Sequence, residues 1–226
     1  MHTFGELSEK LLLAVKKQED TTHLLSEMEH IPFKRLQEFL HTDSQKKAFW
    51  INCYNAYFLI LRVEKKISKS DIYSKKLINI AGVLFSLDDI EHGILRKYRY
   101  KFSRGFLGNL FASRRIKQLA VNAIDYRIHF ALNCGAESCP PIAFYNAEEL
   151  DTQLNIATQA FLMDNTIFNE QQKTVAVTRL FHWYLGDFGS FKGIRKIYKS
   201  QLGKDISDYK IVFQTYSWKE HLFNFK

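Results

Sequence analysis

The sequence feature that most constrains the fold is the segment 44–64, which has a helical pattern and is apolar around most of its circumference. One stripe at helical spacing consists of Phe49, Asn52, Cys53, Ala56, Leu59, Ile60 and Val63, and another side carries Trp50, Tyr54, Tyr57 and Leu61. A helix that is apolar on most sides is buried in the centre of a domain. Buried amides need hydrogen-bond partners, so we predict that Asn52 and Asn55 bond to neighbouring segments inside the core.

The rest of the chain is predicted to supply further helices and a few short strands. Helices are expected at 6–17, 22–29, 32–40, 87–97, 147–163, 179–189 and 191–202. Strands are expected in a hairpin at 76–86 and at 127–133, 174–178 and 211–217. Asp43 is placed to cap the long helix, and Ser86 with Asp89 and Asn146 with Glu149 have the spacing of capping boxes. The predicted fold class is α+β: a buried central helix packed on a small, mostly antiparallel sheet with further surrounding helices.

The length and composition fit one ordered domain. The 226 residues are 46% hydrophobic and include only three prolines, which is enough apolar chain to form a full core. No Gly/Ser-rich or Pro-rich linker and no internal repeat interrupts the sequence. We therefore predict a single domain over residues 1–226.

The charge pattern gives no specific nucleic-acid signature. The formal net charge is +8, but the lysines are spread in pairs over helix surfaces and connections, and the basic stretch 101–115 is expected to be a surface excursion. No zinc-finger or RNA-recognition motif is present. We favour a solvated basic surface, with an acidic partner or substrate as the alternative.

The sequence also contains no membrane segment, since no apolar run approaches the roughly 20 residues of a spanning helix. The N-terminal run LLLAV is too short for a signal peptide. The expected location is the cytoplasm, and export stays open if a signal peptide has been trimmed.

The segment RIHFALNCGAESCPP, residues 127–141, is the most informative for function. A structural zinc site would need two more Cys or His ligands near Cys134 and Cys139, and the remaining cysteine is Cys53. A disulfide across the loop is geometrically possible, but three cysteines and no export signal argue against it. The other interpretations are a reactive thiol, and two buried thiols in a plain turn whose exit is fixed by two prolines.

A reactive thiol would need a nearby imidazole. On an alternating strand, His129 and Asn133 share one face and Cys134 points to the other. Cys139, beyond the turn, is free to return toward His129. We therefore expect Cys139 to be the better nucleophile candidate and Cys134 to pack.

Four segments are similar to the domain-of-unknown-function 547 family. They are AFWINCYNA (48–56), FSLDDIEHGILR (85–96), DYRIHFALNCGAESCPPIAFYNAEELDTQLNIATQAFL (125–162) and FHWYLGDFG (181–189). The resemblance places a family core at about 43–220, after N-terminal helices at about 1–42. The family has no settled biochemical activity, so the resemblance implies fold and site location more than a reaction.

Carried over to this sequence, the family's polar signature falls on Asn52, Asn55, Glu91, His92, His129, Asn133, Cys134, Ser138, Cys139 and Asp187. Cys53 stands where the family usually carries an aliphatic residue. TYSWKEH replaces a motif closer to YDWSLN, which puts in doubt a role for an acidic residue near Trp218. The buried helix and the histidine strand are also similar, at the level of fold alone, to papain-like and transglutaminase-like cysteine hydrolases.

These residues lead to two function hypotheses. The first is a cysteine-dependent hydrolase or acyl transferase, with Cys139, His129, Asn52 and Cys134 as catalytic candidates. Asn52 would bridge to the cysteine loop or the His129 strand, or else donate to an oxyanion or orient His129. The second is a non-catalytic domain that binds a small molecule or a peptide with the same polar cluster.

Each remaining candidate also has a structural interpretation. Binding roles are assigned to Asn55, Glu91, His92, Asn133, Ser138 and Asp187. The sequence favours His92 as a surface or cap-region histidine, and Asp187 as a polar anchor at the end of a helix. No metal and no cofactor are predicted, and the sequence leaves the substrate and the oligomeric state open.

Overall fold

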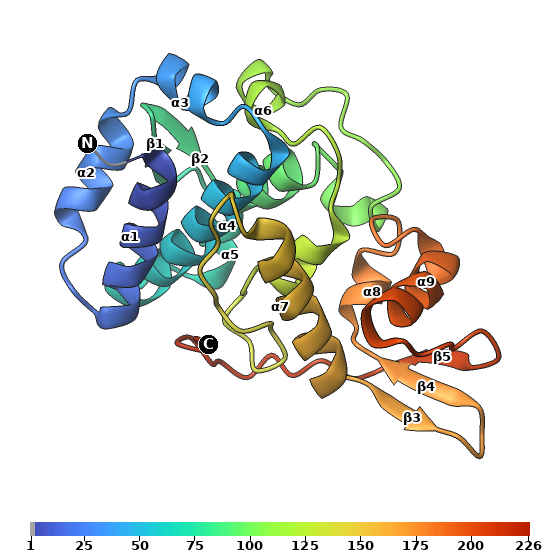
Figure 1. Cartoon of the computed structure of the whole chain (residues 1–226). Coiled ribbons are helices and arrows are strands. Elements are labelled where there is room, and N and C mark those ends of the chain that lie inside the picture. The colour runs from blue at the N-terminus through green and yellow to red at the C-terminus, as the bar shows by residue number, and fades with distance from the viewer. Residues whose placement is uncertain (1–2) are drawn as a thin grey trace.

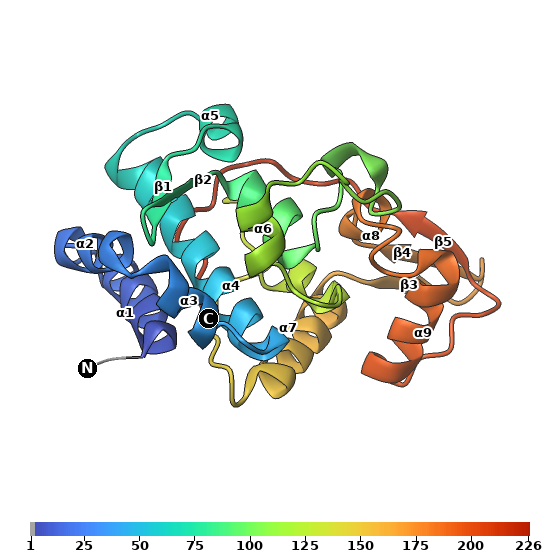
Figure 2. The same ribbon diagram turned by 90° about the horizontal axis from the view of Figure 1, so that it is seen from above.

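A computed structural model describes residues 3–226, in which helices predominate over two small sheets (Figures 1 and 2). The α-helices are α1 (Phe4–Lys17), α2 (Thr22–His30), α3 (Phe33–Phe39), α4 (Asp43–Leu59), α5 (Lys69–Ser74), α6 (Arg114–Leu119), α7 (Leu150–Asp164), α8 (Leu180–Trp183) and α9 (Ser190–Leu202). The strands are β1 (Ile78–Ile80), β2 (Val83–Phe85), β3 (Ile167–Asn169), β4 (Thr174–Val177) and β5 (Lys210–Phe213). Short π-helical turns occupy Ile60–Glu64 and Asp89–Leu95, and 3₁₀ turns occupy Lys101–Ser103 and Tyr126–Phe130.

Helix α4 lies at the centre of the larger hydrophobic core, between α1 and α7 (Figure 1). Every residue from 48 to 59 is buried. The ring of Trp50 packs against Phe85 of the β1–β2 hairpin with 5.3 Å between centroids, and the Tyr57 hydroxyl donates to the carbonyl of Asn79. The prediction of a buried central helix in an α+β fold is confirmed.

The start of α4 differs in detail from the prediction. Thr42, and not Asp43, is the N-cap: its hydroxyl accepts the N–H of Gln45, and the Gln45 side chain accepts the N–H of Thr42. Asp43 is the first helical residue, and its carboxylate accepts the backbone N–H groups of Asn122 and Ala123. The helix start is therefore tied to a segment nearly 80 residues away.

A second hydrophobic cluster lies where α7 and α9 meet the three-stranded sheet, at the lower right of Figure 1. Strand β4 is central, with β3 antiparallel on one side and β5 parallel on the other. Phe130, Phe181 and Phe188 contact one another in this cluster, with ring centroids 4.6–5.9 Å apart. That the two clusters form a single folding unit stays a prediction.

The predicted strand at 127–133 is wrong. The chain there forms the 3₁₀ turn Tyr126–Phe130, and Asp125 caps it by accepting the N–H of Arg127. The Asp125 carboxylate also binds the side chains of Arg127 and Lys47, which holds the turn in place. Beyond the turn, the Asn55 side chain donates to the Ala131 carbonyl at 3.0 Å and accepts the Asn133 N–H at 3.0 Å. These two bonds satisfy backbone groups that a neighbouring strand would otherwise have paired.

Asn52 is buried, as predicted, but its predicted partners are wrong. Its amide donates to the Tyr145 carbonyl at 2.8 Å and to the Ser8 hydroxyl at 3.2 Å, and its oxygen accepts the Tyr145 N–H. Asn52 therefore fastens α4 to α1 and to the segment before α7. Asn55, one helical turn later, is the amide that reaches the segment leading to the cysteines.

Four predicted helices are shorter than expected. Those at 32–40 and 87–97 are reduced to α3 and to the π-helical turn Asp89–Leu95. Helix α7 begins at Leu150 after a turn at 147–149, and the Asn146 N–H donates to the Gln153 side chain. The capping bond from Glu149 N–H to Asn146 is present. Helix α8 ends at Trp183, and turns continue to Gly189. Among residues 3–226, no helix is long and apolar enough to span a bilayer.

We predict that Asn55→Leu lowers the free energy of unfolding by about 2–5 kcal/mol, because it leaves the Ala131 carbonyl and the Asn133 N–H buried and unpaired. Chemical denaturation measures this change. The same replacement at the exposed Asn122 is the matched control and should change stability by less than about 0.5 kcal/mol. Equal effects at the two positions would contradict the role given to Asn55.

Candidate functional site

A pocket of about 240 Å³ opens between α4, the turn Asp89–Leu95, α8 and the segments that carry the cysteines and Tyr216. Its walls are largely aromatic and include Tyr54, Tyr73, Trp183, Tyr184, Tyr216 and Trp218. The rings of Trp183 and Trp218 stack with centroids 5.5 Å apart, and the Lys69 ammonium lies 4.9 Å from the centre of the Trp218 ring. Such walls suit a ligand with a planar or apolar part.

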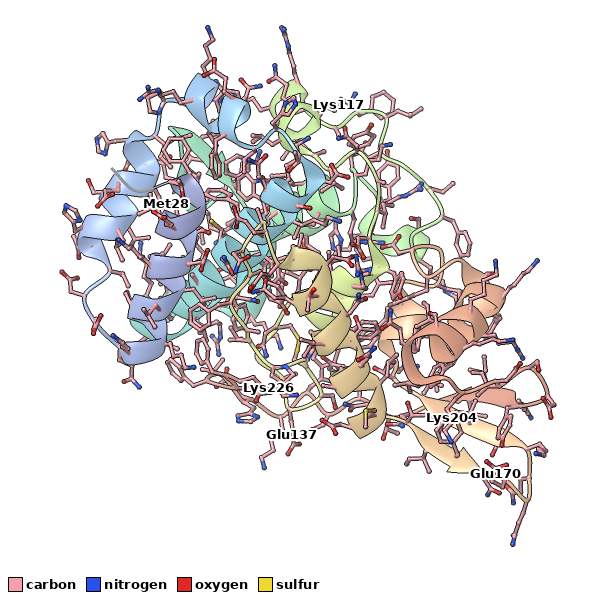
Figure 3. The ribbon with its side chains drawn as sticks, viewed as in Figure 1. Met28, Lys117, Glu137, Glu170, Lys204 and Lys226 are labelled. Atoms are coloured by element: carbon pink, nitrogen blue, oxygen red, sulfur yellow. A yellow bond between two sulfur atoms is a disulfide. The ribbon has the colours of Figure 1, made fainter. Side chains whose placement is uncertain are left out.

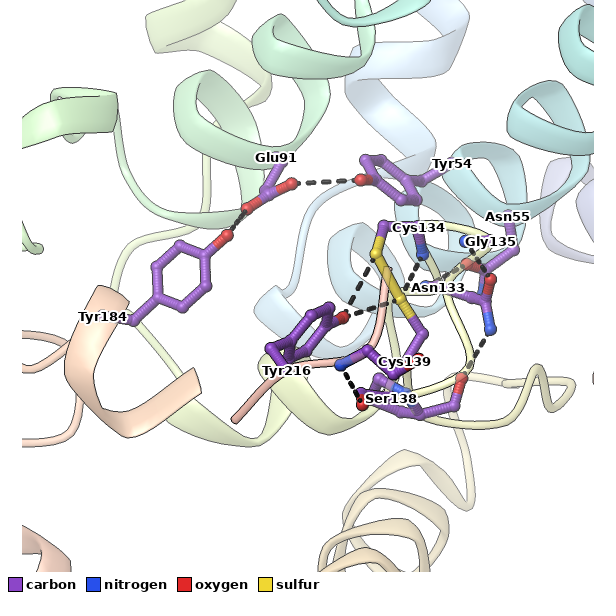
Figure 4. The surroundings of a disulfide bond; sticks show 12 residues. Tyr54, Asn55, Glu91, Asn133, Cys134, Gly135, Ser138, Cys139, Tyr184 and Tyr216 are labelled. Atoms are coloured by element: carbon purple, nitrogen blue, oxygen red, sulfur yellow. Dashed lines mark hydrogen bonds between the residues drawn. A yellow bond between two sulfur atoms is a disulfide. The ribbon is translucent and has the colours of Figure 1, made fainter. Parts of the chain in front are cut away.

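A disulfide between Cys134 and Cys139 forms part of the pocket wall (Figure 4). The sequence argued against this bond because of the low cysteine count and the missing export signal, so that expectation is wrong. Cys139 is buried and Cys134 is half-buried. The Cys139 sulfur accepts the N–H of Cys134 at 3.0 Å, and the Tyr216 hydroxyl lies 3.1 Å from it and 3.3 Å from the Cys134 sulfur.

Asn133 shapes the loop between the two cysteines. Its amide donates to the Pro140 carbonyl at 2.7 Å, and its side-chain oxygen accepts the Gly135 N–H at 2.7 Å. Gly135 has a positive φ of 70°, and a β-carbon there would approach the Phe58 ring to 2.7 Å, so both the turn and the packing require glycine. Asn133 is buried, and its side chain bonds to the residue that follows each cysteine.

The C-terminal segment 214–221 crosses the cysteine loop and brings Tyr216 to the sulfurs. Backbone bonds join Glu137 to Lys219 and Ser138 to Ser217, and the Ser138 hydroxyl accepts the Ser217 N–H at 2.9 Å. Ser138 thus holds this segment in place. Tyr216 lies in the TYSW motif but could not be recognised as a site residue from the sequence, because only the fold brings its hydroxyl to the cysteines.

Glu91 is a buried carboxylate between two tyrosines at one side of the pocket (Figure 4). The Tyr184 hydroxyl donates to one oxygen at 2.7 Å, and the Tyr54 hydroxyl donates to the other at 3.1 Å. Burial alone would raise the pKa of Glu91, but the charges of His92 and Arg96 and the bond from Tyr184 bring it below the ordinary value. Glu91 is therefore ionised at neutral pH.

His129 also lines the pocket, and its partner is Asp187. The His129 Nε2 atom lies 2.9 Å from Asp187 Oδ2, and the His129 ring stacks on Tyr184 with centroids 3.9 Å apart. Asp187 Oδ2 also accepts from Arg96 Nε. Burial lowers the pKa of His129 in spite of the neighbouring carboxylate. The imidazole is therefore neutral at pH 7, and bonding to Asp187 places its proton on Nε2, which leaves Nδ1 as the basic nitrogen.

His92 faces the same pocket from the turn Asp89–Leu95. Arg96 donates to the Nδ1 atom of His92 at 2.7 Å, and the Nε2 atom of His92 lies 3.5 Å from the Asp88 carboxylate. Burial lowers the pKa of His92, and Glu91 opposes this shift. His92 is buried, so the surface position that its sequence context suggested is wrong.

The structure brings some of the predicted site residues together and separates others. Cys134, Cys139, His129, Glu91 and His92 line one pocket. Asn55, Asn133, Ser138 and Asp187 support this group from behind or beside it, and Asn52 bonds to other segments of the core. The tyrosine and tryptophan side chains of the walls were not predicted as site residues, because in their own segments they have only the pattern of apolar positions. Among residues 3–226, no group of three or more His, Cys, Asp or Glu side chains is arranged to hold a metal ion.

Comparison with known proteins identifies one family. The family model described as "Protein of unknown function, DUF547" matches residues 38–162, which is more than half of the 226-residue chain. The match includes the central helix and the cysteine loop. No curated protein and no solved structure matches the chain.

The buried histidines predict a loss of stability in weak acid. The folded-state pKa values of His129 and His92 lie below the ordinary 6.5, so the unfolded chain takes up protons first as the pH falls. Stability is therefore fully present above pH 6.5 and is lost as the pH falls through the lower folded pKa values. Thermal unfolding measured from pH 7.5 downward should show a falling Tm that His129→Gln makes less steep. The exposed His41→Gln is the control, and an unchanged slope in His129→Gln would contradict this assignment.

Proposed function

Since the chain belongs to the DUF547 family, whose function is unknown, we propose from its pocket that it is a thiol-dependent hydrolase or acyl transferase with Cys139 as the nucleophile. The observation that carries the proposal is the setting of the Cys139 sulfur, which faces two hydrogen-bond donors in the pocket wall. A thiolate in that position would accept from the Cys134 N–H and from the Tyr216 hydroxyl. Such bonds favour the charged form of a thiol and lower its pKa.

The disulfide is the resting form in this proposal, and a small-molecule thiol is the reductant. The thiolate of the reductant attacks the Cys134 sulfur, which is the more exposed of the two. The Cys134–Cys139 bond breaks, a mixed disulfide forms on Cys134, and Cys139 leaves as the thiolate. A second reductant thiol then releases Cys134, so that two reductant molecules end as their disulfide and the protein as a dithiol.

Tyr216 suits the role of donor to the departing sulfur. Burial raises the pKa of Tyr216 above its ordinary value, so the hydroxyl keeps its proton at neutral pH. It lies within 3.3 Å of both sulfurs and can follow the charge as it moves from one to the other. A donor already in place needs no rearrangement when the charge develops.

In the reduced form, His129 is the general base. Its Nδ1 atom takes the proton of the Cys139 thiol as the sulfur attacks the acyl carbon, and the protonated ring gives this proton to the leaving group. Water, deprotonated by the same nitrogen, then attacks the thioester and frees Cys139, which regains the proton. Asp187 keeps the imidazole in its orientation through the bond to Nε2. The aromatic walls favour a small molecule or peptide with a planar or apolar group beside the acyl carbon.

A binding domain without catalysis is the second candidate. It is favoured by the disulfide, which occupies both sulfurs, and by the two stacked tryptophans at the pocket. In this case the disulfide stiffens the pocket wall, and the polar cluster serves to hold the pocket open. Both candidates place the ligand in the same cavity and differ in whether Cys139 reacts.

We predict that Cys139 in a Cys134→Ser variant reacts with iodoacetamide with a pH midpoint below 8.5, the ordinary value for a thiol. The variant removes the disulfide but keeps the backbone N–H that donates to Cys139. His129→Gln in the same background should slow the reaction at neutral pH, because the base is lost. Mass spectrometry of the alkylated peptide measures the rate.

Cys53 is the internal control for the alkylation. It is buried in α4, and burial raises the pKa of its thiol, so it should stay unmodified in the folded protein. A midpoint near 8.5, together with a rate at neutral pH that His129→Gln leaves unchanged, would rule out the enzyme and leave the binding domain.

We further predict that Tyr216→Phe, in the Cys134→Ser background, raises the pKa of the Cys139 thiol, since the thiolate loses one donor. The expected change is up to about tenfold less thiolate at neutral pH, the size of one hydrogen bond. The pH dependence of alkylation gives the pKa directly. Tyr73→Phe is the matched control, because Tyr73 lines the pocket and has no hydrogen bond to either sulfur. The same shift in both variants would assign the effect to the pocket wall in general and contradict the role of Tyr216.

A further inference from the structure

The loop between the turn at Asp89–Leu95 and α6 exposes five large apolar side chains within ten residues. The exposed fractions are 92% for Phe102, 54% for Phe106, 63% for Leu107, 79% for Leu110 and 90% for Phe111. Single exposed apolar residues are common on protein surfaces, but a contiguous group marks an interaction site. We call residues 102–111 the apolar loop.

The backbone of the apolar loop is closed and anchored. Tyr100 N–H donates to the Leu107 carbonyl at 3.0 Å, and Asn109 N–H donates to the Tyr98 carbonyl at 2.6 Å. Gly186 N–H donates to the Arg104 carbonyl at 2.7 Å, and a β-carbon at Gly105 would lie 2.3 Å from the Asp187 carboxylate. The loop backbone is therefore held closely against the turn after α8. Its apolar side chains point into solvent.

The surroundings of the apolar loop are strongly basic. From residue 92 to residue 124 the sequence contains no Asp or Glu and eight Lys or Arg residues. Arg96 is buried in its ion pair with Asp187, and Lys101 pairs with Asp88, so the other six supply the positive charge around the loop. Arg114, Arg115 and Lys117 of α6 are exposed next to the loop. Figure 3 shows Lys117 at the outer edge of the molecule, and in Figure 1 the loop follows the same edge.

We propose that the apolar loop docks the protein on an anionic membrane surface, with Phe102 and Phe111 inserted between the lipids. Aromatic and leucine side chains flanked by Lys and Arg are the composition that binds the interface of a bilayer. The basic side chains meet the negative headgroups, and the apolar ones gain from leaving water. A protein partner with an acidic face is less well matched, since it would also have to cover two phenylalanines that are about nine-tenths exposed. This docking is independent of the activity proposed for the pocket.

The test is binding of the full chain to vesicles of phosphatidylcholine with phosphatidylserine, measured by flotation and compared with phosphatidylcholine alone. We expect binding to the anionic vesicles that weakens as salt is added. Phe102→Ser/Phe111→Ser should weaken it about 10- to 100-fold, and Arg114→Gln/Arg115→Gln on the order of 10-fold. These side chains are exposed, so the fold should persist, which thermal unfolding can verify.

Matched controls separate this surface from general charge and hydrophobicity. Ile156→Ser/Met163→Ser also removes two exposed apolar side chains, but from α7. Lys192→Gln/Lys196→Gln also removes two positive charges, but from α9. Both should leave binding within about twofold. An environment-sensitive label on Phe111→Cys should shift to the blue on anionic vesicles.

Three results would overturn the proposal. The first is no flotation with anionic vesicles. The second is vesicle binding that neither Phe102→Ser/Phe111→Ser nor Arg114→Gln/Arg115→Gln weakens. The third is a stable self-association that Phe102→Ser/Phe111→Ser abolishes in a chain that does not bind vesicles. That outcome would make the loop a contact between copies of the chain.

Discussion

The two hydrogen bonds of the Asn55 side chain are the interaction on which the pocket depends. They join the centre of a buried helix to the Ala131 carbonyl and the Asn133 N–H. The Asn133 side chain then fixes the cysteine loop through Pro140 and Gly135. Each bond is directional and shielded from water, so leaving it unmade is costly. The positions of both sulfurs thus follow from one turn of α4.

A second constraint is the group of charges buried beside the pocket. Asp187 and Arg96 form an ion pair with no exposed side-chain surface, and removing one member of such a pair leaves the other charge buried and uncompensated. Arg96 Nη2 and Asp187 Oδ1 are buried without a hydrogen-bond partner among the described residues. His129 bonds to the other Asp187 oxygen, and its ring is held in one orientation against Tyr184. Glu91, Arg96 and His92 form the adjoining group. The same charges that stabilise the fold therefore decide which nitrogen of His129 is basic.

The parts of the structure that could be predicted from the sequence are those set by local pattern. Apolar residues around most of the helix circumference at 44–64 predicted the central helix. The spacing of Ser86 and Asp89 predicted their reciprocal capping bonds. The segment 127–133 failed because its apolar residues fit a strand, while the Asp125 contacts with Arg127 and Lys47 close a turn. The partner of Asn52 and the place of Tyr216 could not be predicted, because they depend on contacts across 93 and 77 residues. The cysteines and histidines singled out from the sequence do line one pocket, whereas the aromatic side chains of its walls could not be assigned to it from the sequence.

The path of the segment 214–221 has a consequence for how the protein is made. A chain leaves the ribosome from its N-terminus, so Cys134 and Cys139 emerge long before Tyr216, which lies 77 residues after Cys139. During that interval the loop lacks the backbone bonds to Ser217 and Lys219 that cover it. The nascent cysteines are then open to any oxidant or thiol of the compartment in which synthesis occurs. That compartment therefore sets whether the pair is a disulfide or a dithiol before the pocket is complete. Tyr216 then covers the form that is present.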